Sequence, residues 1–253
     1  MIKIYKNIQE YIIKNKGFKM DQNLYLNNSS IKNNKYFKTH KELLTLSNKE
    51  LQEIKAYKKR TGFLKNNNRK LGKSIYSFDL PAVVSCPNSD ICFKTCYANK
   101  GAFLYGGTGA KTSNTYNFSI ALNDIKYLQK ELIKEIIKKK INTIRIHSSG
   151  DFFSKEYFLM WCNIARHFKD LKIFTYSKAP QIKNLDLPSN LNIINSFVTI
   201  DNTNYLNYGT YENISKMRSK IKGIICPVTI GKKINCSACK YCITKNKVLF
   251  VQH

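Results

Sequence analysis

Hydrophobic and polar positions alternate along the chain in a pattern that predicts strands and helices in turn from residue 74 onward. Short apolar runs, "SIYSF", "TIRI", "KIFT", "FVTI" and "GII", indicate strands. Between them, residues 112–140 and 154–168 carry apolar residues at helical spacing, and Ser154 is a candidate N-cap. Strands that alternate with helices favour βα units. The pattern therefore predicts an α/β fold with a (βα)-repeat parallel sheet or partial barrel.

The two predicted helical stretches differ in their apolar faces. The first is predicted to be one long helix with a lysine-rich back, and its apolar face is formed by Phe118, Ala121, Ile125, Leu128, Leu132 and Ile136. The second is predicted to bury Tyr157, Phe158, Trp161, Ile164, Ala165 and Phe168. Cys162 lies inside the second stretch, and we expect it to be a small buried hydrophobe rather than a ligand.

The first 72 residues differ from the rest, and we divide the chain into a basic, mainly helical extension (1–72) and an α/β domain (73–253). Within the extension, Ser47 and Glu50 form a capping box, and Gly62 is a stop signal, so a helix is predicted between them. Residues 65–74 have the composition of a polar linker. The extension is either a solvated appendage or an arm that binds a polyanion.

The predicted strands end in chemically active residues. Cys86 follows "PAVVS", residues 147–151 follow "TIRI", residues 176–178 follow "KIFT", and Asp201 and Cys226 follow the last two strands. Because sites in parallel α/β folds form at the carboxyl edge of the sheet, we expect these residues to share one rim. The predicted pocket residues are His147, Asp151, Tyr176, Lys178 and Asp201.

Seven of the eight cysteines fall into two groups far apart in the sequence. The first group is Cys86, Cys92 and Cys96, and the second is Cys226, Cys236, Cys239 and Cys242. Four thiolates suit either a tetrahedral zinc or a [4Fe–4S] cluster, and the run of two-residue gaps favours iron–sulfur ligation over zinc knuckles. Three cysteines would leave one iron of a cluster open. Alternatively, the first group binds zinc with His147, or the two groups share one metal.

Charge and targeting features bear on the partner and the compartment. The net charge of +27 favours a nucleic-acid partner, although a biased base composition of the gene also enriches lysine. Lysine attracts phosphate without reading bases, so no sequence specificity is implied. The chain has no apolar run of membrane-spanning length and no secretory pattern at its start. We therefore expect a cytoplasmic, reducing location and no membrane partner; the oligomeric state is left open.

Several stretches resemble, in order, the motifs of the phage gene-product-88 family. They are "GKSIYSFDLPAVVSCP", "CFKTCYANKG", "RIHSSGDFFSKEYFLMW", "FTYSK" and "ICPVTIGKKINCSAC", and together they cover roughly residues 70–242. The family occurs in bacteriophages and mobile elements. The resemblance implies a phage or mobile-element origin and no particular reaction.

A remoter resemblance is to the radical S-adenosylmethionine enzymes. In these enzymes three cysteines after the first strand bind a cluster whose open iron takes the cofactor, and an acidic turn after the second strand holds its amine. The resemblance implies that Cys86, Cys92 and Cys96 bind such a cluster, and that Ser149, Gly150 and Asp151 bind S-adenosylmethionine. The cysteine spacing and the Ser-Gly-Asp turn differ from that pattern. The alternative is a non-catalytic zinc-stabilised protein that binds DNA or RNA in replication or packaging.

Overall fold

A four-stranded parallel sheet forms the centre of the protein. In the computed structural model, the described residues are 47–86, 96–99, 101–105, 107–179, 186–195, 206–209, 224–244 and 248–251. The sheet consists of β1 (Tyr76–Phe78), β2 (Thr143–Ile146), β3 (Lys172–Ser177) and β4 (Leu191–Asn195), all parallel and in chain order. The predicted α/β fold with a parallel sheet is confirmed.

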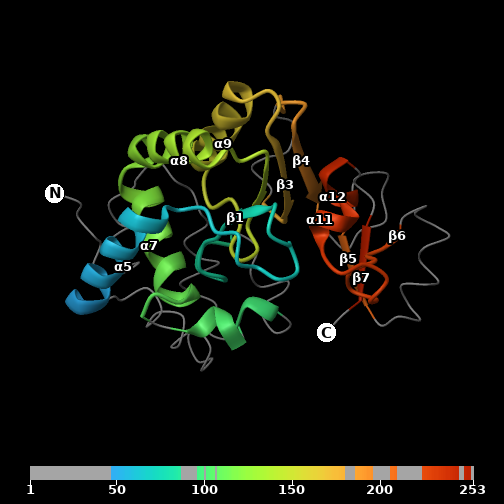
Figure 1. The fold of residues 1–253 in the computed structure, drawn as a ribbon, viewed down its shortest axis with the longest axis horizontal. Helices are drawn as coiled ribbons and strands as arrows, with labels where there is room; N and C mark the ends of the chain where they lie inside the picture. Colours follow the sequence, from blue (N-terminus) through green and yellow to red (C-terminus); the bar gives the residue numbers. More distant parts are fainter. Residues whose placement is uncertain are drawn as a thin grey trace, which may run out of the picture.

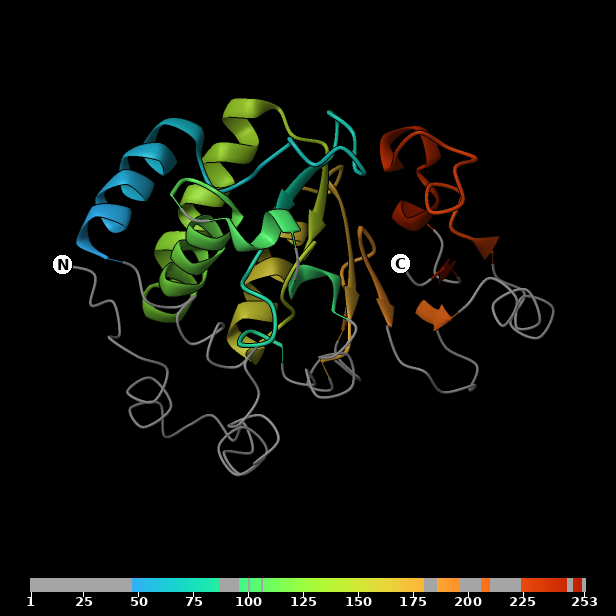
Figure 2. The same cartoon turned by 90° about the horizontal axis from the view of Figure 1, so that it is seen from below.

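Four helices lie together on one side of this sheet (Figures 1 and 2). They are α5 (Asn48–Thr61), α7 (Ala110–Asn123), α8 (Ile125–Lys139) and α9 (Lys155–His167). The predicted starts of α5 and α9 are confirmed, because Ser47 forms a capping box with Glu50 and the Ser154 side chain accepts a hydrogen bond from the Tyr157 N–H. None of the helices in these described stretches is both long and apolar enough to cross a membrane.

The single long helix predicted over residues 112–140 is wrong in one respect, because the chain forms two helices there. Asp124 separates α7 from α8 with a non-helical backbone, φ −152° and ψ 77°. Its carboxylate accepts a hydrogen bond from the Tyr127 N–H at 2.9 Å, so it caps the second helix. Since the break keeps the apolar face of each helix on the sheet, Phe118 and Leu128 are both buried as predicted.

The two faces of the sheet have different roles. Phe78, Ile144 and Ile146 point toward the helices and belong to the main core, where Trp161 and Cys162 of α9 are also fully buried. The opposite face carries Ser77, Arg145 and Phe174, which stand side by side in the strand register. Side chains alternate between faces along each strand, so Asp79 and Tyr176 follow at the carboxyl edge on this second face. His147, which follows β2 with a positive φ, instead contacts Phe152 and Tyr157 of the main core.

A small C-terminal unit lies on the side of the sheet away from the helices (Figures 1 and 2). It contains a second parallel sheet, β5 (Leu206–Gly209), β6 (Ile224–Ile225) and β7 (Val248–Val251), in the order β5-β7-β6. Two one-turn helices, α11 (Cys236–Cys239) and α12 (Tyr241–Thr244), complete it. Only β6 was predicted here. The unit packs through Cys242 and Ile243 on a cluster that contains Phe174 and Leu71.

The predicted strand that ends at Cys86 is wrong. The strand ends at Phe78, and residues 82–85 form a turn in which Val83 has a positive φ of 67°. Pro81 precedes this turn and has no N–H to give to a ladder, so the apolar run "PAVV" reflects burial in a turn rather than a strand. Asp79, not Cys86, is therefore the polar residue at the end of β1.

Some predictions fall on residues that the structure does not describe. These are residues 1–46 of the extension, Cys92, the strand "FVTI" and Asp201. The rest of the predicted extension, residues 47–72, packs on the domain: Ile54, Phe63 and Leu64 belong to the main core and Leu71 to the cluster around Phe174.

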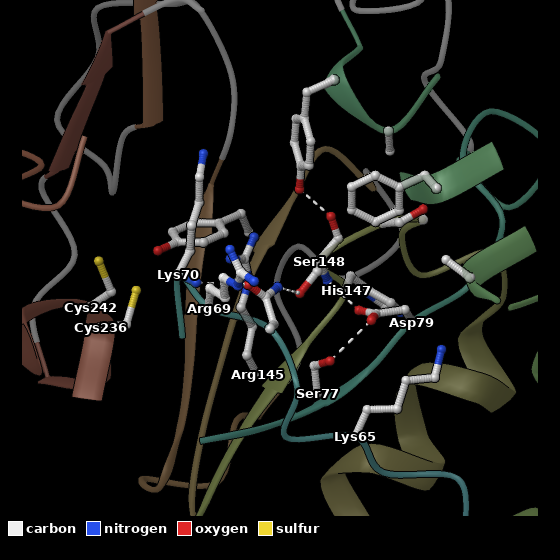
Figure 3. A pocket seen from close by; sticks show the side chains of 18 of the residues that line it. Lys65, Arg69, Lys70, Ser77, Asp79, Arg145, His147, Ser148, Cys236 and Cys242 are labelled. Carbon is white, nitrogen blue, oxygen red and sulfur yellow. Dashed lines mark hydrogen bonds between the residues drawn. The ribbon is translucent and has the colours of Figure 1, made fainter. Parts of the chain in front are cut away.

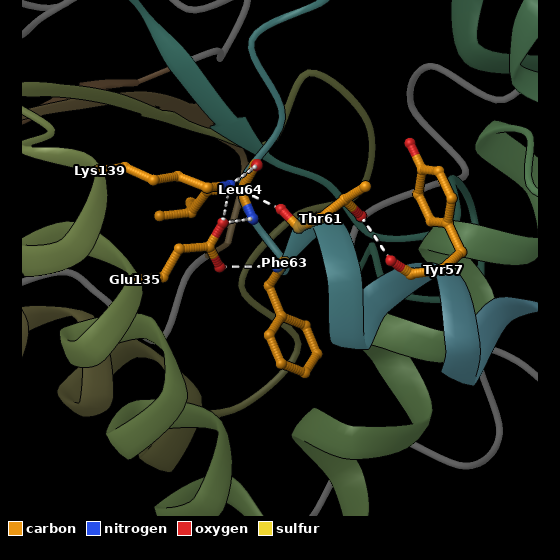
Figure 4. Close-up of polar contacts among 6 residues, drawn as sticks. All are labelled: Tyr57, Thr61, Phe63, Leu64, Glu135 and Lys139. Atoms are coloured by element: carbon orange, nitrogen blue, oxygen red, sulfur yellow. Dashed lines mark hydrogen bonds and ion pairs between the residues drawn. The ribbon is translucent and has the colours of Figure 1, made fainter.

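A buried carboxylate joins α8 to the segment after α5 (Figure 4). Glu135 accepts hydrogen bonds from the backbone N–H groups of Phe63 at 2.7 Å and Leu64 at 3.1 Å, and it pairs with Lys139 at 2.5 Å. Gly62 adopts φ +80°, and a Cβ at this position would stand 2.2 Å from a carboxylate oxygen of Glu135. The stop signal at Gly62 thus also leaves room for this carboxylate.

Candidate functional site

A cavity of about 790 Å³ lies at the carboxyl edge and on the second face of the central sheet. Its walls come from several parts of the chain: Tyr57 of α5, the segment 65–70, the ends of β1 to β3 with the turns that follow them, residues within 96–110 and the C-terminal unit. Figure 3 shows the strand ends on one side of this space and Cys236 and Cys242 of the C-terminal unit on the other. A volume of this size is within the range of small-molecule and cofactor sites.

The cavity brings both cysteine groups together. Its lining includes six thiols, two from the first group and all four from the second: Cys86, Cys96, Cys226, Cys236, Cys239 and Cys242. The one-turn helix α11 carries Cys236 and Cys239, and Asn235 caps it by accepting a hydrogen bond from the Ala238 N–H at 3.0 Å. The two groups, separated by well over a hundred residues, therefore face the same space.

The thiols do not converge on one point. Across the part of the chain that the structure describes, no three His, Cys, Asp or Glu side chains are close enough together to hold a metal ion. Burial raises the pKa of the Cys236 thiol, and it raises the pKa of Cys242 to about 12. In this arrangement the two thiols hold their protons at neutral pH, and a metal would have to displace them.

Charged side chains form the floor of the cavity. The guanidinium of Arg145 on β2 lies over the ring of Tyr176 on β3, 4.9 Å from the ring centroid. Lys65 stands near Asp79, and burial lowers the pKa of its amine, while the Asp79 carboxylate opposes that shift. Asp79 accepts hydrogen bonds from the Ser148 N–H at 2.7 Å and the Ser77 hydroxyl at 3.0 Å.

His147 is held at the end of β2 in a left-handed conformation, φ 64°. Its Nε2 is 3.0 Å from the Tyr157 hydroxyl, and its ring packs on Phe152. Burial lowers the pKa of His147 to about 3, and the positive charge of Arg145 adds to this effect. The imidazole is therefore neutral in the folded protein over the physiological range.

The neutral state of His147 predicts an acid-dependent loss of stability. Below about pH 6.5 the unfolded chain binds a proton that the folded chain does not take up until about pH 3, so stability falls as pH falls through this window. Between pH 7 and pH 5 the wild type should lose about 2 kcal/mol more than His147→Asn, which tolerates a positive φ. Urea unfolding at the two pH values measures the difference, with His167→Asn at an exposed site as control. Equal losses in the wild type and His147→Asn would contradict the assignment.

The turn after β2 is tied to its neighbours on both sides. The Asp151 carboxylate accepts hydrogen bonds from the Ser177 hydroxyl at 2.6 Å and from the N–H groups of Lys178 and Phe152, each at 2.7 Å. Burial raises the pKa of Asp151, and these hydrogen bonds oppose the shift. Asp151 thus connects the ends of β2 and β3, and its expected role toward an amine stays a prediction.

Ser149 and Gly150 connect the same turn to the end of β1. The Ser149 hydroxyl donates to the Leu80 carbonyl at 2.7 Å. Gly150 has φ +86°, and a Cβ there would lie 2.6 Å from both the Leu80 Cβ and the Ser85 Oγ. The glycine therefore permits close packing between the turn after β2 and the segment after β1. Ser149, Gly150 and Asp151 of the turn also line the cavity.

Comparison with known proteins places the chain in a family. The sequence model described as "Gene product 88" matches residues 30–244. The chain belongs to the gene product 88 family. The match begins forty residues earlier than the resemblance noted from the motifs, so the family region includes part of the lysine-rich N-terminal segment.

Two phage proteins are similar to part of the chain. The Gene 88 protein of Mycobacterium phage D29 is 28% identical over 102 residues, which cover 37% of this chain and 42% of the phage protein. The Gene 88 protein of Mycobacterium phage L5 is 28% identical over 102 residues, 37% of this chain and 43% of that protein. The chain thus spans about two-fifths of the length of these curated relatives. No solved structure matches the chain.

Sequence reasoning missed several charged residues of this cavity, including Arg145, Asp79 and Lys65. Arg145 lies in the middle of the apolar strand "TIRI", and a lone cation inside a buried strand was a usable signal. Asp79 was missed because "PAVVS" was assigned as a strand, so that Cys86 rather than Asp79 was taken as the polar residue at its end. Lys65 was assigned to a polar linker, but its backbone pairs with Ser77 and its side chain lines the cavity.

Proposed function

We propose that this gene product 88 family protein is a cysteine-ligated metalloprotein of a phage or mobile element. Its cavity holds an iron–sulfur cofactor, and its target is nucleic acid. The observation that carries the proposal is that six cysteines from two distant sequence groups line one cavity. Inert core thiols would have no reason to gather at a polar strand edge, and Cys162 in the helical core is the contrasting case.

The donor set fits a soft metal. Thiolates are the usual ligands of iron–sulfur clusters and of structural zinc. Cys226, Cys236, Cys239 and Cys242 would supply four of them, and Cys86 and Cys96 two more, with Cys92 outside the described residues. When bound, an iron–sulfur cluster supplies electron transfer. The chain's own contribution is a partly apolar enclosure that includes Phe174, Tyr176 and Phe250, together with the positive charge of Arg145.

The charge of the cavity supports a nucleic-acid target. Six of its lining residues are cationic and two are acidic; the cations are Lys65, Arg69, Lys70, Arg145, Lys178 and Lys240, and the acids are Asp79 and Asp151. The net charge of the whole chain has the same sign, +27. Lysine and arginine around a cleft attract phosphate groups and raise their local concentration.

Metal and sulfide analysis tests the proposal. Protein purified without oxygen is expected to be brown, to absorb broadly near ~400 nm and to contain iron with acid-labile sulfide. Colourless protein with stoichiometric zinc would favour the alternative, a zinc-stabilised DNA- or RNA-binding protein. Protein that binds neither metal under these conditions would overturn both.

The finer proposal is a reaction of the radical S-adenosylmethionine type. It rests on the resemblance described above and on the position of Ser149, Gly150 and Asp151 on the cavity wall. Iron-loaded protein given dithionite as reductant and S-adenosylmethionine is expected to release 5′-deoxyadenosine and methionine. Iron-loaded protein that leaves S-adenosylmethionine intact would reduce the proposal to an electron-transfer or structural cluster.

A further inference from the structure

Arg145 is half-buried, and its guanidinium has no acidic partner among the described residues. Its Nε atom is buried and has no hydrogen-bond partner in the described part of the chain, and none of the ion pairs found there involves it. An arginine stays protonated in proteins, so its charge must be balanced by another route than loss of a proton. The stacking on Tyr176 offsets only part of the cost of burial.

The two carboxylates of the cavity form no ion pair with Arg145, although the charge of Asp79 helps to raise the pKa of the guanidinium. Asp79 is engaged by the Ser77 hydroxyl and the Ser148 N–H, and Asp151 by the ends of β2 and β3. Both are thus held by neutral donors. The cations at the rim, Arg69 and Lys70, are exposed and extend the positive charge of Arg145 outward (Figure 3). The arrangement suits an anionic group that enters from the rim and reaches Arg145.

Aromatic rings line another side of the same cavity. Tyr97 and Tyr105 are 44% and 63% exposed; among the other aromatic side chains of the described residues, Tyr127 at 40% is the comparably exposed one. Tyr97 also donates a hydrogen bond to the Ser148 carbonyl at the end of β2, and its ring contacts Phe103 edge-on at 5.6 Å. Exposed aromatic rings beside a cationic groove form the platform on which unpaired bases stack.

We infer that the cavity binds a nucleotide unit, with its phosphate on Arg145 and its base against Tyr97 and Tyr105. The inference deepens the proposed function, because it names the ligand class of the same cavity and rests on the same nucleic-acid target. The nucleotide is either free or part of a single strand, since an aromatic platform needs an unpaired base. Double-stranded nucleic acid offers phosphate but no accessible base face.

Binding of a labelled oligonucleotide by full-length protein tests the inference. Fluorescence anisotropy with fluorescein-labelled single-stranded oligo-dT carrying a 5′-phosphate is expected to show affinity that Arg145→Gln weakens about tenfold or more. The matched control is Arg166→Gln, which removes an exposed arginine paired with Asp186 at the end of α9, far from the cavity lining. If both variants weaken oligonucleotide binding equally, the effect comes from the overall charge of the protein, and the inference is overturned.

A second variant separates binding from folding. Tyr105→Ala truncates an exposed side chain, so the fold should be unchanged, yet the loss of one stacked base is expected to weaken binding about tenfold. Thermal unfolding of each variant identifies any that does not fold. Arg145→Lys keeps the charge but not the planar fork, and it should recover part of the affinity. Unchanged affinity in Tyr105→Ala would overturn the aromatic half of the inference.

Salt dependence and competition define the ligand source. Removing one phosphate contact should lower the slope of log affinity against log salt by about 0.7 for a single strand. Competition by free 5′-nucleotides at low micromolar to millimolar concentration would identify a mononucleotide site, whereas competition by oligonucleotides alone would identify a strand. Binding that double-stranded DNA matches, with no effect of Arg145→Gln, would overturn the inference.

The metal content of the same preparations keeps the two proposals apart. Specific nucleotide binding by protein without iron or zinc would support the nucleotide site and reject the proposed metalloprotein. Iron-loaded protein that binds neither nucleotides nor single strands would reject the nucleotide site and leave the metal proposal standing.

Discussion

Replacing Glu135 with alanine is expected to lower the free energy of unfolding by about 3 kcal/mol. The carboxylate is only 8% exposed and serves two backbone N–H groups, those of Phe63 and Leu64, as well as the Lys139 ammonium. Its removal leaves the two backbone N–H groups buried without this acceptor, whereas Lys139 keeps the Thr61 and Leu64 carbonyls. The penalty for the two unpaired N–H groups exceeds the value of any one hydrogen bond. Urea or guanidinium unfolding at neutral pH measures the change.

The same helix supplies the control for this prediction. Glu131 pairs with Lys134 at 2.7 Å in a more solvent-exposed position, so Glu131→Ala should change the stability by no more than about 0.5 kcal/mol. A large loss of stability in Glu131→Ala, or a small one in Glu135→Ala, would contradict the prediction that the contacts between Glu135 and the segment after α5 stabilise the fold.

Replacing Cys236 with alanine is expected to reduce the iron bound per protein molecule by about half or more. Cys236 lies on α11 and faces the cavity with three other thiols of its group. Cluster binding requires thiolate ligands, so the loss of one from a set of four removes most of the affinity. If the two groups hold separate clusters, half of the iron remains; if they share one, all of it is lost.

Two further variants test which cysteines bind the iron. Cys86→Ala tests the first group in the same way. Loss of all the iron in both variants would indicate a shared site, whereas loss of about half in each would indicate two separate clusters. Cys162 is fully buried in α9 among core side chains, and burial raises the pKa of its thiol to about 11. Cys162→Ala should therefore retain the full iron content. Iron that is insensitive to both cavity variants, or that is lost with Cys162, would contradict the ligand assignment.

The elements with strong local signals were predictable. The helices α5 and α9 begin at residues whose side chains cap them, Ser47 and Ser154, and such caps are decided within one turn of chain. The strands β2 and β3 are short apolar runs bounded by polar residues, and their parallel pairing follows from the helix between them. The break at Asp124 was missed because apolar periodicity continues across it.

The cavity was predictable only in part. Strand ends on one edge of a parallel sheet gather His147, Asp151 and Tyr176, and this much follows from topology. The pairing of Arg145 with Tyr176 and the engagement of Asp151 by Ser177 depend on which strands are neighbours and in what register. A one-residue shift of register would move these side chains to the other face.

The sequence by itself determined the α/β class, the helix starts, the membership of Cys162 in the core and the existence of two cysteine groups, because each of these depends on residues close together in the chain. Only the tertiary structure decided that six cysteines line one cavity, that Lys65 and Arg145 form its floor, and that the C-terminal unit closes it opposite the strand ends. These features join residues that are far apart in sequence. Local propensity carries no information on such contacts, which are fixed by the burial of Phe174 and Leu71 beneath the C-terminal unit.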